Sequence, residues 1–137
     1  MNMASLQEEL IRDEALRLKP YIDTRGKWTI GVGRNLSDDG ISREEAMMML
    51  NNDITIAVSA LDSLLPWWRK LSEVRQHVLI NMCFNMGAQK LAGFRLALAA
   101  MEKGDYEEAA RQMEASEWYN EVGNRAIRLT EQMRLGA

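Results

Sequence analysis

The amino-acid sequence predicts a mainly helical α+β protein, with a small β lobe joined by a long helix to a helical lobe. Residues about 15–40 are rich in β-branched and aromatic side chains and are punctuated by glycine, which favours short strands. Residues about 42–65 carry a broad apolar face behind a capping box, Ser42 to Glu45, which favours a long helix. Residues about 66–137 repeat apolar positions at helical spacing. The 137 residues suffice for a single domain.

A short helix and a β-hairpin come first in the chain. Leu6 and Leu10 follow the spacing of an amphipathic helix, and Ser5 is a candidate N-cap. We expect this helix to end near Glu14 and to pack with the helical lobe. Pro20 then breaks the helical pattern, the letters DTRG suit a tight turn, and KWTIGVG is typical of a short strand.

Helical signals dominate the rest of the chain. Pro66 stops the long helix, Ser72 can cap the next one, and Gly87 ends it. This next helix is apolar almost all round, which indicates a central position. Three further helices are predicted at about 94–101, 105–116 and 124–135.

Charge and composition argue against several classes of partner. A net charge of -3 and a pI near 5.3 do not suit a protein that binds phosphates, since such binding needs clustered Lys and Arg. No apolar run approaches the roughly 18 residues of a membrane helix. The opening letters MNMASLQEELIRDE lack the basic and apolar regions of a signal peptide. We therefore expect no nucleic-acid partner, no membrane insertion and a chain that accumulates in the cytoplasm.

Cysteine and histidine are too few for a disulfide framework or a metal cluster. Cys83 is the single cysteine, lies in the apolar run VLINMCFNM and is expected to be a buried thiol. His77 is the single histidine and has no Cys or His at ligand spacing. The sequence predicts no disulfide, no bound metal and no other cofactor.

Three polar residues around the predicted hairpin are candidates for chemistry. Glu14 ends the first helix, Asp23 lies in the turn, and Thr29 lies in the returning strand. A hairpin folded against a helix end would bring them together. Hydrolysis of a glycosidic bond needs two carboxyl groups in unlike environments, one protonated and one ionised. Acidic residues at helix ends and turns are also common as solvated caps, and spacing alone leaves both interpretations open.

A resemblance to a known family favours the catalytic interpretation. The stretch LIRDEALRLKPYIDTRGKWTIGVG, with its E-x8-D-x5-T spacing, resembles the catalytic segment of the phage-type lysozymes, glycoside hydrolase family 24. The resemblance continues through LINMCFNMGAQKLAGF, YEEAARQM and SEWYNEVGNRAIR. These motifs occur in the family's order from one end of the chain to the other, and they imply a two-lobed, lysozyme-like fold.

The resemblance implies a muramidase that cuts the β-1,4 bond between N-acetylmuramic acid and N-acetylglucosamine in peptidoglycan, with inversion. Glu14 aligns with the family's general acid, and Asp23 and Thr29 align with the residues that place and activate the attacking water. Arg125 aligns with an arginine that pairs with the catalytic glutamate. From its own spacing, Arg125 is equally a solvated charge at a helix start.

Further residues of the helical lobe are implied near bound sugar. They are Phe84, Asn85, Gln112, Trp118 and Asn120. For the two aromatic members of this set, Phe84 and Trp118, the sequence alone favours places in the core.

The chain departs from the family pattern in two places. Arg34 stands where many members carry histidine, so a histidine-based ion pair is absent. The second departure is brevity: the segment GRNLSDDGIS is expected to lead from Arg34 directly into the long helix, where larger members insert additional hairpin or helical structure. The acidic net charge is also unusual, because many lytic muramidases are strongly basic, and it predicts weak adhesion to anionic walls.

These observations predict a monomeric phage or prophage endolysin that acts on peptidoglycan glycan strands. It would stay in the host cytoplasm until a separate holin releases it to the periplasm at lysis. Three alternatives stay open: a lytic transglycosylase, a catalytically silent peptidoglycan-binding relative, and a helical interaction domain. The second carboxylate and the threonine argue against the first of these, since a transglycosylase needs no residue to place water.

Overall fold

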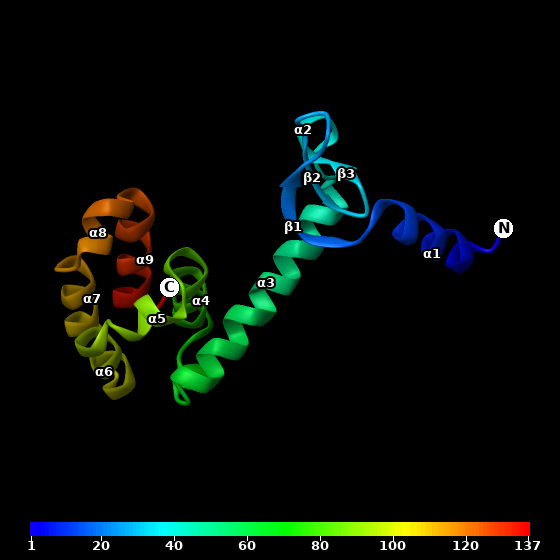
Figure 1. Cartoon of the computed structure of the whole chain (residues 1–137). Helices are drawn as coiled ribbons and strands as arrows, with labels where there is room; N and C mark the ends of the chain where they lie inside the picture. Colours follow the sequence, from blue (N-terminus) through cyan, green and yellow to red (C-terminus); the bar gives the residue numbers. More distant parts are fainter. The chain divides into compact units, whose positions relative to one another are not determined.

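The structure is a computed structural model that describes every residue from 1 to 137. The chain divides into two compact units, Met1–Met48 and Met49–Ala137. The helices are α1 (Met3–Glu14), α2 (Leu36–Asp39), α3 (Arg43–Leu64), α4 (Glu73–Met86), α5 (Ala88–Ala92), α6 (Arg95–Lys103), α7 (Tyr106–Glu114), α8 (Glu117–Val122), α9 (Asn124–Leu135) and the short 3₁₀ helix η1 (Trp68–Lys70) (Figure 1). The strands are β1 (Arg17–Ile22), β2 (Trp28–Gly31) and β3 (Arg34–Asn35). The mainly helical α+β class predicted from the sequence is confirmed.

Helix α1 opens the first unit and ends at Glu14, as predicted. Its N-cap is Asn2 and not Ser5, because the Asn2 side chain accepts a hydrogen bond from the Ser5 amide at 3.0 Å. Every residue of α1 is exposed in the structure. The predicted packing of this helix with the helical lobe stays a prediction.

The three strands form an antiparallel sheet in the order β1-β2-β3. Thr29 on the central strand pairs with Tyr21 on one side and with Asn35 on the other. The register of β1 shifts between Arg17 and Tyr21, around Pro20, which has no amide hydrogen to donate. The sheet thus fixes the position of Thr29 from both sides.

The segment after Arg34 is more structured than predicted. It does not run directly into the long helix, because β3 and the one-turn helix α2 intervene. The Asn35 side chain caps α2 by accepting a hydrogen bond from the Asp38 amide at 3.0 Å. Gly40 then ends the turn at a φ of 61°, which a glycine adopts without strain.

An ion pair ties this connection to the start of α3. Both terminal nitrogens of Arg34 donate to the Glu45 carboxylate, at 2.8 and 2.9 Å, and Nη1 also donates to the Gly40 carbonyl oxygen at 3.2 Å. Glu45 in turn accepts from the Ser42 amide at 2.8 Å, which completes the predicted capping box. The arginine that replaces the family's histidine therefore makes an ion pair of its own.

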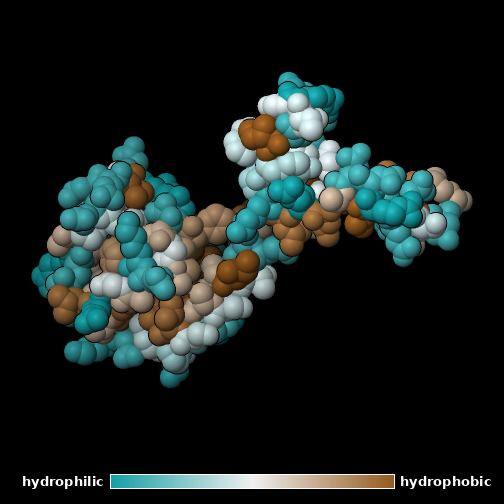
Figure 2. Space-filling model, in the orientation of Figure 1, coloured by the Kyte–Doolittle hydropathy of each residue, from teal (hydrophilic) through white to brown (hydrophobic).

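The first unit has almost no hydrophobic core. Thr29, with 3% of its surface exposed, is its one buried residue. Large apolar side chains of this unit are open to solvent, and Figure 2 shows such hydrophobic (brown) surface. They include Met3, Leu6, Leu10, Ile11, Leu16, Leu18, Ile22, Trp28, Val32 and Ile41.

The second unit has a continuous hydrophobic core. Helix α7 packs against α6 and α9, and α4 packs against α5 and α9. Val78, Leu79 and Met82 of α4 are fully buried, which confirms the central position predicted for this helix. The short helices α5 and α8 were not predicted from the sequence, because each is too brief to show a full helical period.

A prediction about a single residue of this unit is also confirmed. Cys83 is a buried thiol, and its burial raises the pKa of the thiol. Trp68 is buried in the core beside the partly buried Trp67, so this pair is mainly a packing feature. The Trp68 indole nitrogen donates to Asp62 at 2.8 Å.

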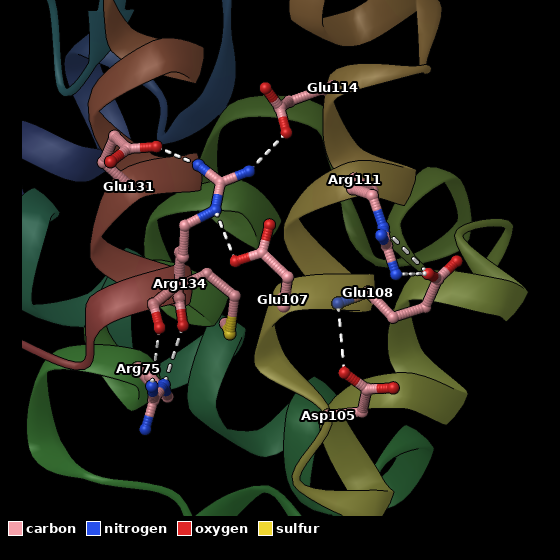
Figure 3. Close-up of polar contacts among 9 residues, drawn as sticks. Arg75, Asp105, Glu107, Glu108, Arg111, Glu114, Glu131 and Arg134 are labelled. Carbon is pink, nitrogen blue, oxygen red and sulfur yellow. Dashed lines mark hydrogen bonds and ion pairs between the residues drawn. The ribbon is translucent and has the colours of Figure 1, made fainter.

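Two arginines hold the C-terminal end of α9 (Figure 3). Arg75 on α4 donates to the carbonyl oxygens of Met133 at 2.8 Å and of Arg134 at 3.1 Å, and its guanidinium lies 3.4 Å from the centre of the Tyr106 ring. Arg134 itself donates to three carboxylates on α7 and α9, those of Glu107, Glu114 and Glu131. The carbonyl groups at this helix end are therefore satisfied by Arg75 of α4, and the Arg134 side chain links the same end of α9 to α7.

The Arg34–Glu45 pair predicts a specific dependence of stability on pH. The hydrogen bonds from Arg34, and then those from Ser42, lower the pKa of Glu45 from 4.5 to about 2. Since the folded-state pKa is the lower one, the ion pair stabilises the fold fully above pH 4.5, and this contribution is lost as the pH falls towards 2. Glu45→Gln should therefore be less stable than the wild type at neutral pH, and the gap should close in acid. Denaturant unfolding at a series of pH values measures it.

Glu44→Gln is the matched control for this experiment. It removes a carboxylate from the same first turn of α3 but breaks no ion pair. An equal loss of stability in both variants would show that the helix dipole, and not Arg34, accounts for the effect.

Candidate active site

Asp23 lies in the turn between β1 and β2, where its side chain is held by the backbone. Its Oδ1 accepts hydrogen bonds from the amides of Arg25 at 2.8 Å and of Lys27 at 2.9 Å. The bond from Lys27 is the largest influence and lowers the pKa of Asp23. Partial burial opposes it, and the amide and guanidinium of Arg25 lower the pKa further. The carboxylate is therefore ionised at neutral pH. Its Oδ2 has only the loose contact with Arg25 at 3.7 Å, so this oxygen can accept a further hydrogen bond.

Thr29 is joined to the same turn through Lys27. Its hydroxyl donates to the Lys27 carbonyl oxygen at 3.0 Å, and the Asp23 amide donates to that oxygen at 2.9 Å. Because the hydroxyl proton is engaged, the Thr29 oxygen presents lone pairs to its surroundings. The backbone amide and carbonyl of a single residue, Lys27, thus position both polar side chains.

Glu14 is the last residue of α1, and its surroundings differ from those of Asp23. Its side chain is exposed and lies against the turn that joins β2 to β3, where Gly33 approaches its carboxylate. The next residue, Ala15, has φ 65° and ψ 151°, a conformation that is ordinarily restricted to glycine. The chain turns sharply here from α1 into β1, so the Glu14 side chain is left at the helix end.

The first unit therefore combines two carboxyl groups of different kind. Asp23 is fixed by two amides and held ionised, whereas Glu14 accepts no hydrogen bond from the protein. A fixed carboxylate can accept a proton from water, and a second carboxyl group in different surroundings is the other component that such chemistry needs. The arrangement suits paired acid and base chemistry.

In the helical unit, Arg125 lies at the start of α9 and is partly buried. Its Nε donates to the Asn81 side-chain oxygen at 2.8 Å, so it is not a free solvated charge. Both residues line an apolar groove of about 440 Å³. The remaining lining residues are Leu50, Ile54, His77, Ile80 and Phe84.

The other predicted groove residues are distributed over α4, α7 and α8. The Trp118 indole nitrogen donates to the Asn85 oxygen at 2.9 Å, and Gln112 donates to Glu108 at 2.8 Å. Trp118 is buried and meets the Phe94 ring edge to face at 6.0 Å, so it is a core aromatic residue. Phe84 and Asn120 are exposed, so the core position that the sequence favoured for Phe84 is wrong.

The structure thus places Glu14, Asp23 and Thr29 in one unit and all the other predicted site residues in the second. Sequence reasoning missed two residues that lie against these side chains: Asn81, which is hydrogen-bonded to Arg125, and Gly33, which lies beside the Glu14 carboxylate. In the sequence, Asn81 is one residue of the LINMCF motif and Gly33 is one glycine of a predicted turn. Nothing in either pattern indicates a contact with a site residue. Neither spacing nor composition marks a residue that acts through its neighbour.

No group of three or more His, Cys, Asp or Glu side chains in the structure could hold a metal ion. None of the helices combines the length and the apolar character needed to cross a membrane.

Comparison with known proteins identifies the class and the family. Residues 12–133 match the family described as Phage lysozyme. This match agrees with the two unlike carboxyl groups of the first unit, Glu14 at the end of α1 and Asp23 in the turn between β1 and β2, and it identifies a protein of the lysozyme type. The chain belongs to the phage lysozyme family.

Individual relatives agree with this assignment. The chain is 26% identical over 163 residues to the probable T4-type lysozyme 1 of Dictyostelium discoideum, covering 98% of this chain and 96% of that protein. It is 32% identical over 109 residues to the endolysin of Salmonella phage P22, covering 74% and 73%. It is also 33% identical over 154 residues to the pre-baseplate central spike protein Gp5 of Enterobacteria phage T4. That last match covers 92% of this chain but spans 27% of the length of the spike protein.

The strained backbone beside Glu14 gives a prediction for stability. A conformation of this kind costs roughly 1–3 kcal/mol at a non-glycine residue. Ala15→Gly should remove that strain, against a cost of about 0.4–1 kcal/mol for the greater freedom of glycine in the unfolded chain. We expect a net stabilisation of about 1 kcal/mol, measured by denaturant unfolding.

Ala46→Gly is the control, because Ala46 lies exposed in the first turns of α3 with ordinary helical geometry. It should destabilise the protein by up to about 1 kcal/mol. The same sign for both variants would contradict the strain at Ala15.

Proposed function

We propose that this protein is a muramidase that hydrolyses the β-1,4 bond between N-acetylmuramic acid and N-acetylglucosamine in peptidoglycan, with inversion at the anomeric carbon. One observation carries the proposal: Asp23, held ionised by two backbone amides, shares a small unit with Thr29 and with the carboxyl group of Glu14. Membership of the phage lysozyme family supports it.

In the proposed reaction Glu14 gives its proton to the glycosidic oxygen as the bond from that oxygen to the anomeric carbon breaks. A water molecule attacks the anomeric carbon from the opposite face of the sugar ring and forms the new carbon–oxygen bond. The free Oδ2 of Asp23 takes a proton from this water, and the Thr29 oxygen accepts a hydrogen bond from it. Exchange with solvent then restores the proton on Glu14 and the charge on Asp23.

The helical unit would supply contacts to the glycan strand. We assign this role to Phe84, Asn85, Gln112, Trp118 and Asn120. The contact of Trp118 would be limited to the edge that its packing leaves free. Asn85 and Gln112 would each present the part of the amide group that is not already bonded to Trp118 or Glu108.

In the active enzyme, Arg125 would form an ion pair with Glu14. Helix α1 would pack with the helical unit. The support is that the helix buries no residue of its own, although Leu6, Leu10 and Ile11 form an apolar face. The bond from Asn81 would orient the guanidinium for this pairing.

We further propose a role in lysis of the host by a phage or prophage. The protein would be a monomer that stays in the host cytoplasm until a separate holin gives it access to the periplasm. With a net charge of -3, it would reach the anionic wall without long-range attraction. Hydrolysis would therefore depend on ionic strength less steeply than with a basic enzyme.

The test is the release of soluble fragments from purified peptidoglycan by the wild type and by Glu14→Gln. The wild type should produce fragments with new, hydrated reducing ends, identified by their mass. Glu14→Gln should be at least about a hundredfold slower, as expected when a general acid is removed. Glu9→Gln is the matched control, because it removes a carboxylate from the exposed surface of the same helix.

Other outcomes would replace the proposal by a different one. Anhydro products would identify a lytic transglycosylase. Binding to cell-wall sacculi without any release of fragments would identify a catalytically silent relative.

A further inference from the structure

Helix α1 lies against the turn that joins β2 to β3. Gly31 and Gly33 flank Val32 in this turn, with φ values of +71° and +69°. Val32 lines a hollow of about 400 Å³ together with Gln7, Leu10 and Ile11 of α1. The last turns of the helix and the glycine turn are therefore neighbours within the first unit.

The two glycines have the same backbone conformation but different surroundings. A methyl group on the Cα of Gly31 would meet no atom within 4 Å. A methyl group on the Cα of Gly33 would lie 2.7 Å from Oε2 of Glu14, 3.2 Å from its Cδ and 3.4 Å from its Cγ. The space beside Gly33 is thus the place that the Glu14 carboxylate occupies.

We infer that Gly33 is a positioning residue for the Glu14 carboxylate: the missing side chain leaves the space in which the proton-donating group sits. The inference rests on the proposed function, in which Glu14 is the general acid. All the close atoms belong to the outer part of a flexible side chain, so a methyl group at residue 33 can be relieved by moving that carboxylate. The backbone can stay in place while the acid is displaced.

The displacement should affect catalysis more than substrate binding. A misplacement of about 1 Å at a reacting group can cost about a hundredfold in rate. Glu14 would act on the glycosidic oxygen only, whereas most contacts to the glycan would come from other residues. We therefore expect kcat to fall while KM changes little.

The experiment compares Gly33→Ala with Gly31→Ala. Both variants place alanine in a left-handed conformation, so both should lose a similar amount of stability in denaturant unfolding. On a soluble fragment of peptidoglycan glycan, Gly33→Ala should lower kcat by about 30–100-fold and change KM by less than about threefold. Gly31→Ala should keep a kcat close to that of the wild type. The ¹³C signal of the Glu14 side-chain carboxyl should move in Gly33→Ala only.

The possible results separate this inference from the proposed function. Equal kcat values and an unmoved Glu14 signal in the two variants would overturn the role of Gly33. If the wild type and Gly31→Ala both fail to release fragments, the proposed function fails, and the ¹³C signal alone decides whether Gly33 places the carboxylate. If Gly33→Ala does not fold, Gly33→Asn and Gly31→Asn repeat the comparison, because asparagine tolerates positive φ better than alanine.

Discussion

The backbone of Lys27 is the point on which the candidate site depends. Its amide donates to the Asp23 carboxylate, and its carbonyl oxygen accepts from the Thr29 hydroxyl and from the Asp23 amide. If the backbone on both sides of the Lys27 Cα changed its conformation, the carboxylate and the hydroxyl would both lose these hydrogen bonds. The site is thus organised by main-chain groups, which require no side-chain ordering and so hold the polar atoms at low entropic cost.

This reliance on hydrogen bonds follows from the make-up of the first unit. Its one buried side chain is that of Thr29, so hydrophobic burial contributes little to its internal order. The internal order of this unit depends instead on hydrogen bonds and ion pairs. They are the helix caps, the bonds of the turn at Asp23 and the bidentate pair of Arg34 with Glu45. The helical unit is stabilised differently, by a continuous apolar core, and Arg75 satisfies the carbonyl groups at the end of α9. The candidate catalytic residues Glu14, Asp23 and Thr29 therefore lie in the first unit, whereas the hydrophobic core lies in the second.

Much of this could be predicted from the sequence, wherever one local rule applied strongly. The capping box at Ser42, the cap at Ser72 and the stop at Gly87 define α3 and α4, because each rule concerns a few adjacent residues. The placing of Glu14 at a helix end followed in the same way.

What could not be predicted depends on contacts that are distant in the chain or on very short elements. The N-cap of α1 is Asn2 and not the predicted Ser5, because two good capping residues lie within one turn of each other. The pair of Arg34 with Glu45 joins residues on either side of α2, and the bond of Arg125 to Asn81 joins two helices far apart in sequence. No periodicity or spacing along the chain encodes such partners.

The role of Lys27 has a consequence for how the site would look across related sequences. Its amide and carbonyl are common to every residue except proline, which lacks the amide hydrogen. The side chain at this position makes only a partly exposed ion pair with Asp38. Relatives could therefore carry almost any residue at position 27, and only proline would be excluded. A position central to the site would look variable in an alignment, while the residues that it holds would look invariant.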